Sequence, residues 1–169
     1  KKRESKNGEK KMAVYHSSKP ECMISDKGEI LRLFKAGKYA VIAMCRNNEP
    51  YAVTLSYGYD EKTNSMYFHS ALKGLKIDFI KDNSRVCAII IEDLGYIEND
   101  CQHKYSSLAV YGKMSVIDGL DEKKYAMEAM FNHLEKDPLE IKKRFIKSDK
   151  TYDSIAMMKL EIESVTAKS

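Results

Sequence analysis

A short stretch of polar and basic side chains, FHSALKGLKIDFIKDN, has the composition of a phosphate-binding site. His69 and Ser70 end an expected strand. A turn with Lys73 and Gly74 then leads into an expected helix that carries Lys76. The N–H groups and dipole of a helix start favour an anion, lysine adds positive charge, and a serine hydroxyl can donate a hydrogen bond. From spacing alone, lysines at a helix start are more often solvated than bound to a ligand.

The preceding strand has small and hydroxyl side chains at alternate positions. In PYAVTLSYG, Thr54 and Ser56 alternate with Val53 and Leu55. An extended backbone with small side chains can offer N–H and C=O groups to the edge of a flat heterocycle. The same pattern fits an ordinary barrel strand equally well.

The candidate residues must be positioned by helices and strands, and two motifs mark where helices begin. Asp26 followed by Glu29 matches a capping box. Asp137-Pro138 followed by Glu140 matches a helix start led by proline. An apolar stripe is expected on the helix that begins at Asp26, at Ile30, Leu31 and Phe34. Another is expected on the helix over residues 72–82, at Leu72, Leu75, Phe79 and Ile80.

Runs rich in β-forming residues, separated by short turns, make up most of the remaining chain. The expected strands cover residues 39–46, 51–59, 66–70, 85–92, 105–118 and 154–165, and the expected helices begin at residues 26, 72, 121 and 137. A polar stretch, DLGYIENDCQHK, connects two of the strands. Most connections are too short for the crossover helices of a doubly wound sheet. We therefore expect a mainly β chain with flanking α-helices, built as a six-stranded antiparallel barrel.

The formal net charge of +4 comes entirely from the beginning of the chain. Residues 1–11 carry six basic and two acidic side chains, so the remainder is formally neutral. We expect residues 1–22 to form a basic, flexible tail and residues 23–169 to form one domain. A basic tail can bind nucleic acid or an anionic membrane, but no basic patch with interleaved aromatics continues into the domain. We expect neither partner, and the absence of a long apolar run or secretory signal favours a cytoplasmic protein.

The four cysteines are widely scattered and form no CxxC pair. Cys45 and Cys87 lie in apolar runs, which predicts buried free thiols in a reducing compartment rather than disulfides or a structural zinc. Cys101 and His103 are the one close pair of soft ligands, and two ligands do not make a metal site. No metal site is predicted.

The motifs, taken in order, resemble the nitroimidazole-resistance flavoproteins of the pyridoxamine 5'-phosphate oxidase-like, FMN-binding split-barrel superfamily. The resemblance spans about residues 23–168 and depends on the segments YAVIAMCRNNEPYAVTLSYGYD, MYFHSALKGLKIDFIKDNSRVCAII, CQHKYSSLAVYG and EIESVTAK. Two departures are visible. The chain lacks the arginine-rich C-terminal signature of the pyridoxamine-phosphate oxidases, so oxidation of pyridoxamine phosphate is not expected. Ala167 stands where the nitroimidazole-resistance ending more often has glycine.

The resemblance implies a split barrel that forms a homodimer with two FMN molecules at the subunit interface. It implies that the phosphate lies against Ser70 and Lys76, with His69 and Lys73 close by. The strand Val53–Ser56 would run beside the isoalloxazine ring, and the other subunit would close the pocket. The implied cofactor-binding residues are Val53, Thr54, Leu55, Ser56, His69, Ser70, Lys73, Lys76, Tyr105 and Ser106.

The leading functional hypothesis is an FMN-dependent reductase that passes electrons from NAD(P)H to a small acceptor such as a nitro-aromatic or a quinone. No catalytic acid or base is assigned, because His69 fits a phosphate-binding or pocket-lining role as well as proton transfer. Two alternatives use the same barrel: a non-enzymatic FMN carrier, and a haem protein with His69, His103 or His133 as axial ligand. A third, a nucleic-acid module, depends on the basic tail.

Overall fold

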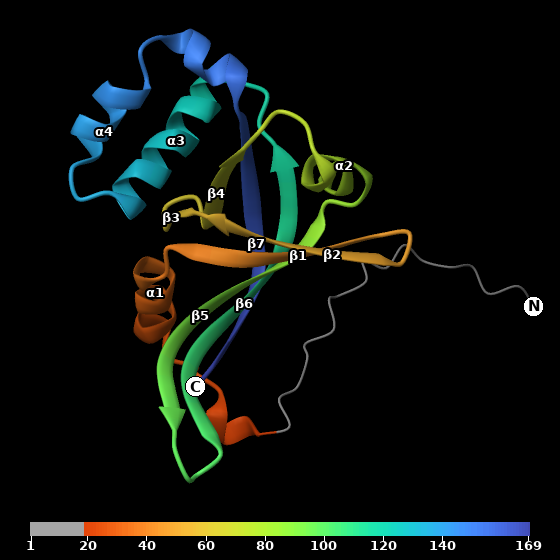
Figure 1. Cartoon of the computed structure of the whole chain (residues 1–169), viewed down its shortest axis with the longest axis vertical. Helices are drawn as coiled ribbons and strands as arrows, with labels where there is room; N and C mark the ends of the chain where they lie inside the picture. The colour runs from red at the N-terminus through yellow and green to blue at the C-terminus, as the bar shows by residue number, and fades with distance from the viewer. Residues whose placement is uncertain (1–18) are drawn as a thin grey trace, which may run out of the picture.

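A computed structural model of the chain describes residues 19–169, and the sequence predictions that concern residues 1–18 lie outside the described part. The strands are β1 (Tyr39–Arg46), β2 (Glu49–Ser56), β3 (Gly58–Asp60), β4 (Ser65–Ser70), β5 (Arg85–Ile97), β6 (Gln102–Val116) and β7 (Ala156–Lys168). The helices are α1 (Lys27–Ala36), α2 (Leu75–Asp82), α3 (Leu120–Leu134) and α4 (Pro138–Phe145), with 3₁₀ turns η1 (Pro20–Cys22) and η2 (Asp149–Ser154). Figure 1 shows the strands crossing at the centre, with α3 and α4 above them and α2 beside them.

All seven strands pair antiparallel in the order β2-β1-β5-β6-β7-β4-β3. The two end strands, β2 and β3, follow one another in the sequence with only Tyr57 between them. The chain therefore runs directly from one end of the sheet to the other, which curls the sheet into a split barrel. The fold prediction is confirmed, and the run expected as one strand over residues 51–59 is divided at Tyr57.

The division at Tyr57 has a clear physical cause. Tyr57 is fully buried and donates a hydrogen bond from its hydroxyl to the Phe34 carbonyl at 2.7 Å. The next residue, Gly58, faces the backbone of α3, where an added Cβ would lie 2.6 Å from the Cα of Met130. Glycine at this position lets β3 approach α3 more closely than any side chain would allow.

Both predicted helix starts are present, although the first is only half of a capping box. The Asp26 carboxylate accepts a hydrogen bond from the Glu29 backbone N–H at 2.7 Å, and Asp137 accepts one from the Glu140 N–H at 2.9 Å. The Glu29 side chain does not return to Asp26; it bonds to Arg32 instead. A strong ionic partner one turn away thus replaces the weaker bond to the backbone.

The second helix is shorter than predicted. It begins at Leu75 rather than at residue 72, because Gly74 has φ 142°, a conformation that no helix contains. Leu72 and Leu75 are exposed, and the buried face of α2 consists of Ile77, Phe79 and Ile80.

The polar stretch 93–104, expected as a connection, is a strand hairpin. β5 and β6 continue to pair through Asp93–Tyr105, Tyr96–His103 and Ile97–Gln102, with a register shift between Asp93 and Tyr96. We call this projecting hairpin, residues 91–106, the arm; it is the lowest feature of Figure 1. Its strands escaped prediction because almost every side chain in it is exposed, so no apolar alternation marks them.

The four cysteines are free, but the predicted burial of Cys45 is wrong. Buried and exposed positions alternate along β1, and Cys45 lies on the outward face although its neighbour Met44 is buried. Cys87 is half-buried, and burial raises the pKa of its thiol. The alternation expected for the last strand is confirmed, with Met158 and Leu160 buried and Glu161 exposed.

The start of the described chain lies against its end. Met23 forms a β-bridge with Lys168, and the Cys22 carbonyl accepts a hydrogen bond from the Ser169 N–H at 2.9 Å. Within residues 19–169, no helix is both long enough and apolar enough to span a bilayer.

Candidate functional site

The segment from Ser70 to Lys76, here called the phosphate corner, lies where β4 ends and α2 begins. Ser70 is half-buried, and its hydroxyl donates to the adjacent Ala71 carbonyl at 2.9 Å. Lys73 is exposed in the loop, and Lys76 is half-buried in the first turn of α2. Neither lysine has an ion-pair partner among residues 19–169. Positive charge at the corner is therefore available to a ligand.

The start of α2 adds free backbone donors to the corner. No side chain caps this helix, and the Gly74 carbonyl accepts from the N–H groups of Ile77 and Asp78. The first N–H groups of any helix have no partner inside it. No atom lies within 4 Å of the position a Cβ would take on Gly74, so the approach is open. The residue types and geometry fit a phosphate group.

The strand β2 presents two different faces. Val53 and Leu55 are half-buried against the core, whereas Thr54 and Ser56 are exposed. As an end strand of the sheet, β2 has no strand partner along its outer edge within the described chain. Its outer N–H and C=O groups are thus placed to bond a ligand edge.

Three contacts join α2 to the neighbouring strands, one to β2 and two to β1. The rings of Tyr51 and Phe79 lie with their centroids 5.1 Å apart. The Arg46 guanidinium, at the end of β1, lies 4.4 Å from the centroid of the Phe79 ring and 3.3 Å from the Asp82 carboxylate. Eight of the ten predicted residues therefore lie on β2, the end of β4, the loop after it and the start of α2, and β2 contacts both β4 and α2. His69, the eighth, is exposed at the end of β4.

The other two residues, Tyr105 and Ser106, lie at the root of the arm, where Tyr105 is exposed and Ser106 is buried. Ser70 of β4 pairs with Ala156 of β7, and two residues later on β7, Met158 pairs with Val116 at the end of β6. The phosphate corner therefore lies near the end of β6. Ser106 lies ten residues before Val116 on that strand, about 30 Å away in extended backbone. Within one chain, these residues and the phosphate corner cannot contact one phosphate group.

None of the ten residues lines either of the two main hollows in the described chain. A cavity of about 490 Å³ between α1, β3 and α3 is lined by Tyr59, Asp60, Tyr125 and His133, among others. Another of about 440 Å³ lies behind α2 and includes Leu72 and Met114. In the first, the Asp60 carboxylate accepts a hydrogen bond from the Tyr125 hydroxyl at 2.5 Å, which raises the pKa of Tyr125 to about 12. Burial tends to raise the pKa of Asp60, but its hydrogen bonds together lower it.

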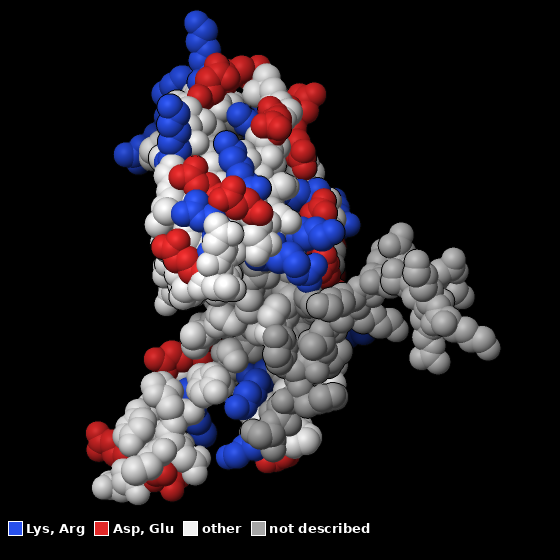
Figure 2. All heavy atoms as spheres, turned by 90° about the vertical axis from the view of Figure 1, so that its right-hand side faces the viewer, with Lys and Arg blue, Asp and Glu red and all other residues white. Residues whose placement is uncertain are grey.

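The histidines considered as haem ligands differ in their surroundings. His103 bonds to the Asp93 carboxylate at 2.8 Å, and His133 bonds to the Gly37 carbonyl at 2.6 Å. The His69 ring has no hydrogen bond within residues 19–169. No three side chains of His, Cys, Asp or Glu in this part of the chain gather as a metal site. Basic and acidic side chains are interspersed over the upper part of the face in Figure 2.

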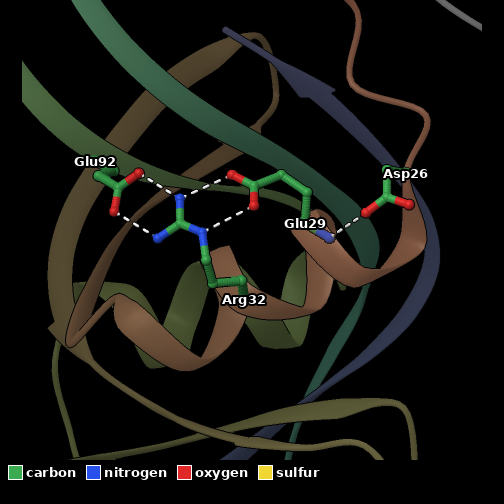
Figure 3. Close-up of polar contacts among 4 residues, drawn as sticks. All are labelled: Asp26, Glu29, Arg32 and Glu92. Atoms are coloured by element: carbon green, nitrogen blue, oxygen red, sulfur yellow. Dashed lines mark hydrogen bonds and ion pairs between the residues drawn. The ribbon is translucent and has the colours of Figure 1, made fainter.

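An ionic cluster at the root of the arm was not identified from the sequence. Arg32 on α1 bonds two carboxylates, Glu29 on the same helix and Glu92 on β5, each through two N–H···O contacts (Figure 3). Hydrogen bonds from Arg32 lower the pKa of both carboxyl groups. The spacing of Glu29 and Arg32 is visible in the sequence, but Glu92 is 60 positions away from Arg32. No local pattern links them.

A family comparison agrees with this architecture. The family model described as pyridoxamine 5'-phosphate oxidase matches residues 26–169. The chain therefore belongs to the pyridoxamine 5'-phosphate oxidase family, the flavin-binding split barrels. No protein of curated function matches the chain by sequence.

Solved structures with the same fold are numerous. One, from Bacteroides thetaiotaomicron, is provisionally described as a 5-nitroimidazole antibiotic resistance protein; it is 24% identical with TM-score 0.72, over 86% of this chain and 85% of that one. The flavocytochrome Anf3 from Azotobacter vinelandii is 14% identical with TM-score 0.76, over 94% and 73% of the two chains. An FAD-binding protein from Mesorhizobium loti is 19% identical with TM-score 0.60, over 84% and 93%. At these identities the likeness shows the fold alone.

Proposed function

We propose that this protein is an FMN-dependent oxidoreductase that uses NAD(P)H to reduce a small acceptor such as a nitro-aromatic or a quinone. The observation that carries the proposal is the phosphate corner. Ser70, the unpaired Lys73 and Lys76, and the uncapped start of α2 offer a hydroxyl, two ammonium groups and free N–H groups to one anion. Membership of a flavin-binding family supports a flavin phosphate as that anion.

We also propose that the cofactor lies between two copies of the chain. Tyr105 and Ser106 are too far along β6 to meet the phosphate corner of their own chain. The exposed face of β2 lines neither of the two cavities described above for residues 19–169. The arm carries exposed apolar side chains, Ile91, Leu94 and Tyr96 among them, which favour a protein contact. A second copy would bring its arm to the open side of the first.

The side chains of this site bind and orient the cofactor. FMN supplies the hydride and electron transfer when it is bound. Ser70 and Lys76 hold the phosphate, with Lys73 adding charge. The outer edge of β2 at Thr54 and Ser56 orients the ring by backbone hydrogen bonds, and Val53 and Leu55 fix that strand to the core. His69, exposed beside Ser70, is a pocket-lining group.

Absorbance spectra of the purified protein test this function directly. We expect flavin bands, FMN as the flavin released on denaturation, and bleaching when NADH or NADPH is added without oxygen. Addition of a nitro-aromatic or a quinone should restore the oxidised spectrum. Protein without any flavin affinity would overturn the proposal, and a Soret band would replace it with haem binding. Bound flavin that neither donor bleaches would instead indicate a carrier.

A further inference from the structure

The arm leaves the barrel with little packing to hold its direction. β1 pairs with β5 only over residues 87–89, and beyond that point β5 is paired to β6 alone on the described chain. Of residues 91–105, only Glu92 and Ile97 are even half-buried. In Figure 2, the lower left of the molecule projects from the rest and carries acidic and basic side chains among uncharged ones. The orientation of the arm must therefore be set at its root.

The Arg32 side chain connects that root to α1. The Arg32 guanidinium donates to the Glu92 carboxylate at 2.8 and 2.6 Å, and to the Glu29 carboxylate at 2.9 and 2.8 Å. The guanidinium lies between the two carboxylates, as Figure 3 shows. Bidentate contacts of this kind fix orientation as well as distance, because the N–H donors of the planar guanidinium are rigidly arranged.

We call the bonds of Arg32 to Glu29 and Glu92 the clamp. Its end on α1 is fixed in the core, and its end on the arm lies beside the predicted flavin contacts. Leu33 and Phe34, the residues after Arg32, are almost fully buried in the core. Glu92 is the direct strand partner of Ser106, and the neighbouring Asp93 pairs with Tyr105. The register shift of β5 begins immediately beyond Asp93. Any rotation of the arm about its root would move these paired residues together.

We propose that Arg32 is a positioning residue: by clamping Glu92 to α1, it sets the angle at which the arm presents the exposed Tyr105 to the flavin held by a second copy of the chain. This inference rests on the proposed function. The ion cluster is remote from the phosphate corner of its own chain, but under this proposal it affects how tightly the second copy binds flavin.

The exposure of the cluster separates this role from a purely stabilising one. The side chains of Arg32, Glu29 and Glu92 are 45%, 37% and 29% exposed. Ion pairs this accessible to water contribute little to folding stability. Loss of the clamp should therefore change flavin affinity much more than it changes the melting temperature.

Glu29 and Glu92 provide a matched pair of variants. Glu92→Gln and Arg32→Gln should each weaken FMN binding by about tenfold or more, the scale of misplacing a binding group through its support. Glu29→Gln removes a similar carboxylate from the same guanidinium but leaves the bridge to the arm, so its affinity should stay within about twofold of wild type. Fluorescence titration of the apoproteins gives the affinities, and thermal melts give the stability. Equal affinities for Glu29→Gln and Glu92→Gln would overturn the proposal.

Mixed dimers test the action across the interface. The Arg32→Gln chain keeps its phosphate corner but has a misdirected arm. A Ser70→Ala/Lys76→Ala chain has a damaged corner but a correctly held arm. A dimer of the two contains one site built from both intact parts, so we expect about one tightly bound FMN per mixed dimer, and none at the same concentration in either parent.

The outcomes distinguish this inference from the function on which it rests. Mixed dimers without restored binding would show that Arg32 acts only within its own chain, which overturns the inference and leaves the reductase proposal in place. A wild-type protein that binds FMN as a monomer would have the same meaning. A wild-type protein that binds no flavin would overturn the proposed function, and the inference with it.

Discussion

A hydroxyl and an ammonium group can hold a phosphate only when no other group of the protein occupies them. Ser70 donates only to the carbonyl of its own neighbour, a bond that it can exchange for a ligand at small cost. Lys76 is half-buried on the first turn of α2 and has no acidic partner in the described chain. Ion pairs alone do not single out these lysines, because in the described chain only a few lysines, such as Lys35 with Glu61, pair with a carboxylate. The support for a binding site is that a hydroxyl, two ammonium groups and an uncapped helix start follow one another in one short segment.

Replacing both side chains tests this site at the residue scale. We expect Ser70→Ala/Lys76→Ala to weaken FMN binding by about 1–3 kcal/mol for each lost contact, because a hydrogen bond and a charge leave the phosphate. The affinity can be measured by flavin fluorescence on the apoprotein. Lys81→Ala, at the other end of the same helix, is the control and should bind normally. A double variant that purifies with full FMN would contradict the assignment.

At the scale of elements, α3 is held to the junction between α1 and β1 by one histidine. The His133 ring bonds the Gly37 carbonyl, packs 4.8 Å from the centroid of the Tyr57 ring, and is half-buried. Lys38 donates to the His133 backbone carbonyl at 2.6 Å, which brings a positive charge close. Burial lowers the pKa of His133 from 6.5, and the charge of Lys38 adds to that effect. The fold thus holds this histidine neutral.

This arrangement predicts that the attachment of α3 weakens in mild acid. The unfolded chain takes up a proton on His133 near pH 6.5, whereas the folded chain does so only at lower pH. The stabilisation is therefore complete above about pH 7 and declines as the pH falls through 6.5. Urea unfolding at pH 7.5 and 5.5 should show a larger loss for wild type than for His133→Gln, which keeps a donor for Gly37 but does not titrate. Equal losses in the two proteins would exclude this role.

At the scale of the whole molecule, exposed apolar side chains lie on α4 at the helical end, as Leu139 and Phe145 do, and also on β1 and the arm. Tyr39, Ile91, Leu94 and Tyr96 are all more than half exposed on β1 and the arm. Isolated exposed apolar residues are ordinary, but a group on one projecting element favours an interface. The arm also lacks any covering element within the described chain.

We therefore expect the protein to have the mass of two chains in solution. Ile91→Glu should shift it towards the monomer at micromolar concentration and release flavin, because a charge would have to be buried without a partner. Light scattering coupled to gel filtration measures the mass. Leu139→Glu, at an even more exposed position on α4, is the control and should remain dimeric. A dimeric, flavin-loaded Ile91→Glu protein would place the interface elsewhere.

The features that the sequence determined by itself are local ones. The caps at Asp26 and Asp137 form between residues three positions apart, and the alternation from Met158 to Glu163 expresses directly which face of β7 meets the core. The phosphate corner is local as well, because its groups follow one another between a strand end and a helix start. Family resemblance added the prediction that the strand Val53–Ser56 lies beside a flavin ring, which spacing alone left undecided.

Tertiary structure decided whatever depends on residues far apart in the chain. Cys45 faces outward because of its place in the alternation of β1. The long strand is divided at Tyr57 because that side chain is buried and bonds to the Phe34 carbonyl. The arm has no apolar alternation because neither of its faces is covered, so burial could not reveal its strands. The clamp of Glu92 by Arg32 joins elements 60 positions apart. Such pairings arise from the closure of the barrel, and no periodicity in the sequence encodes them.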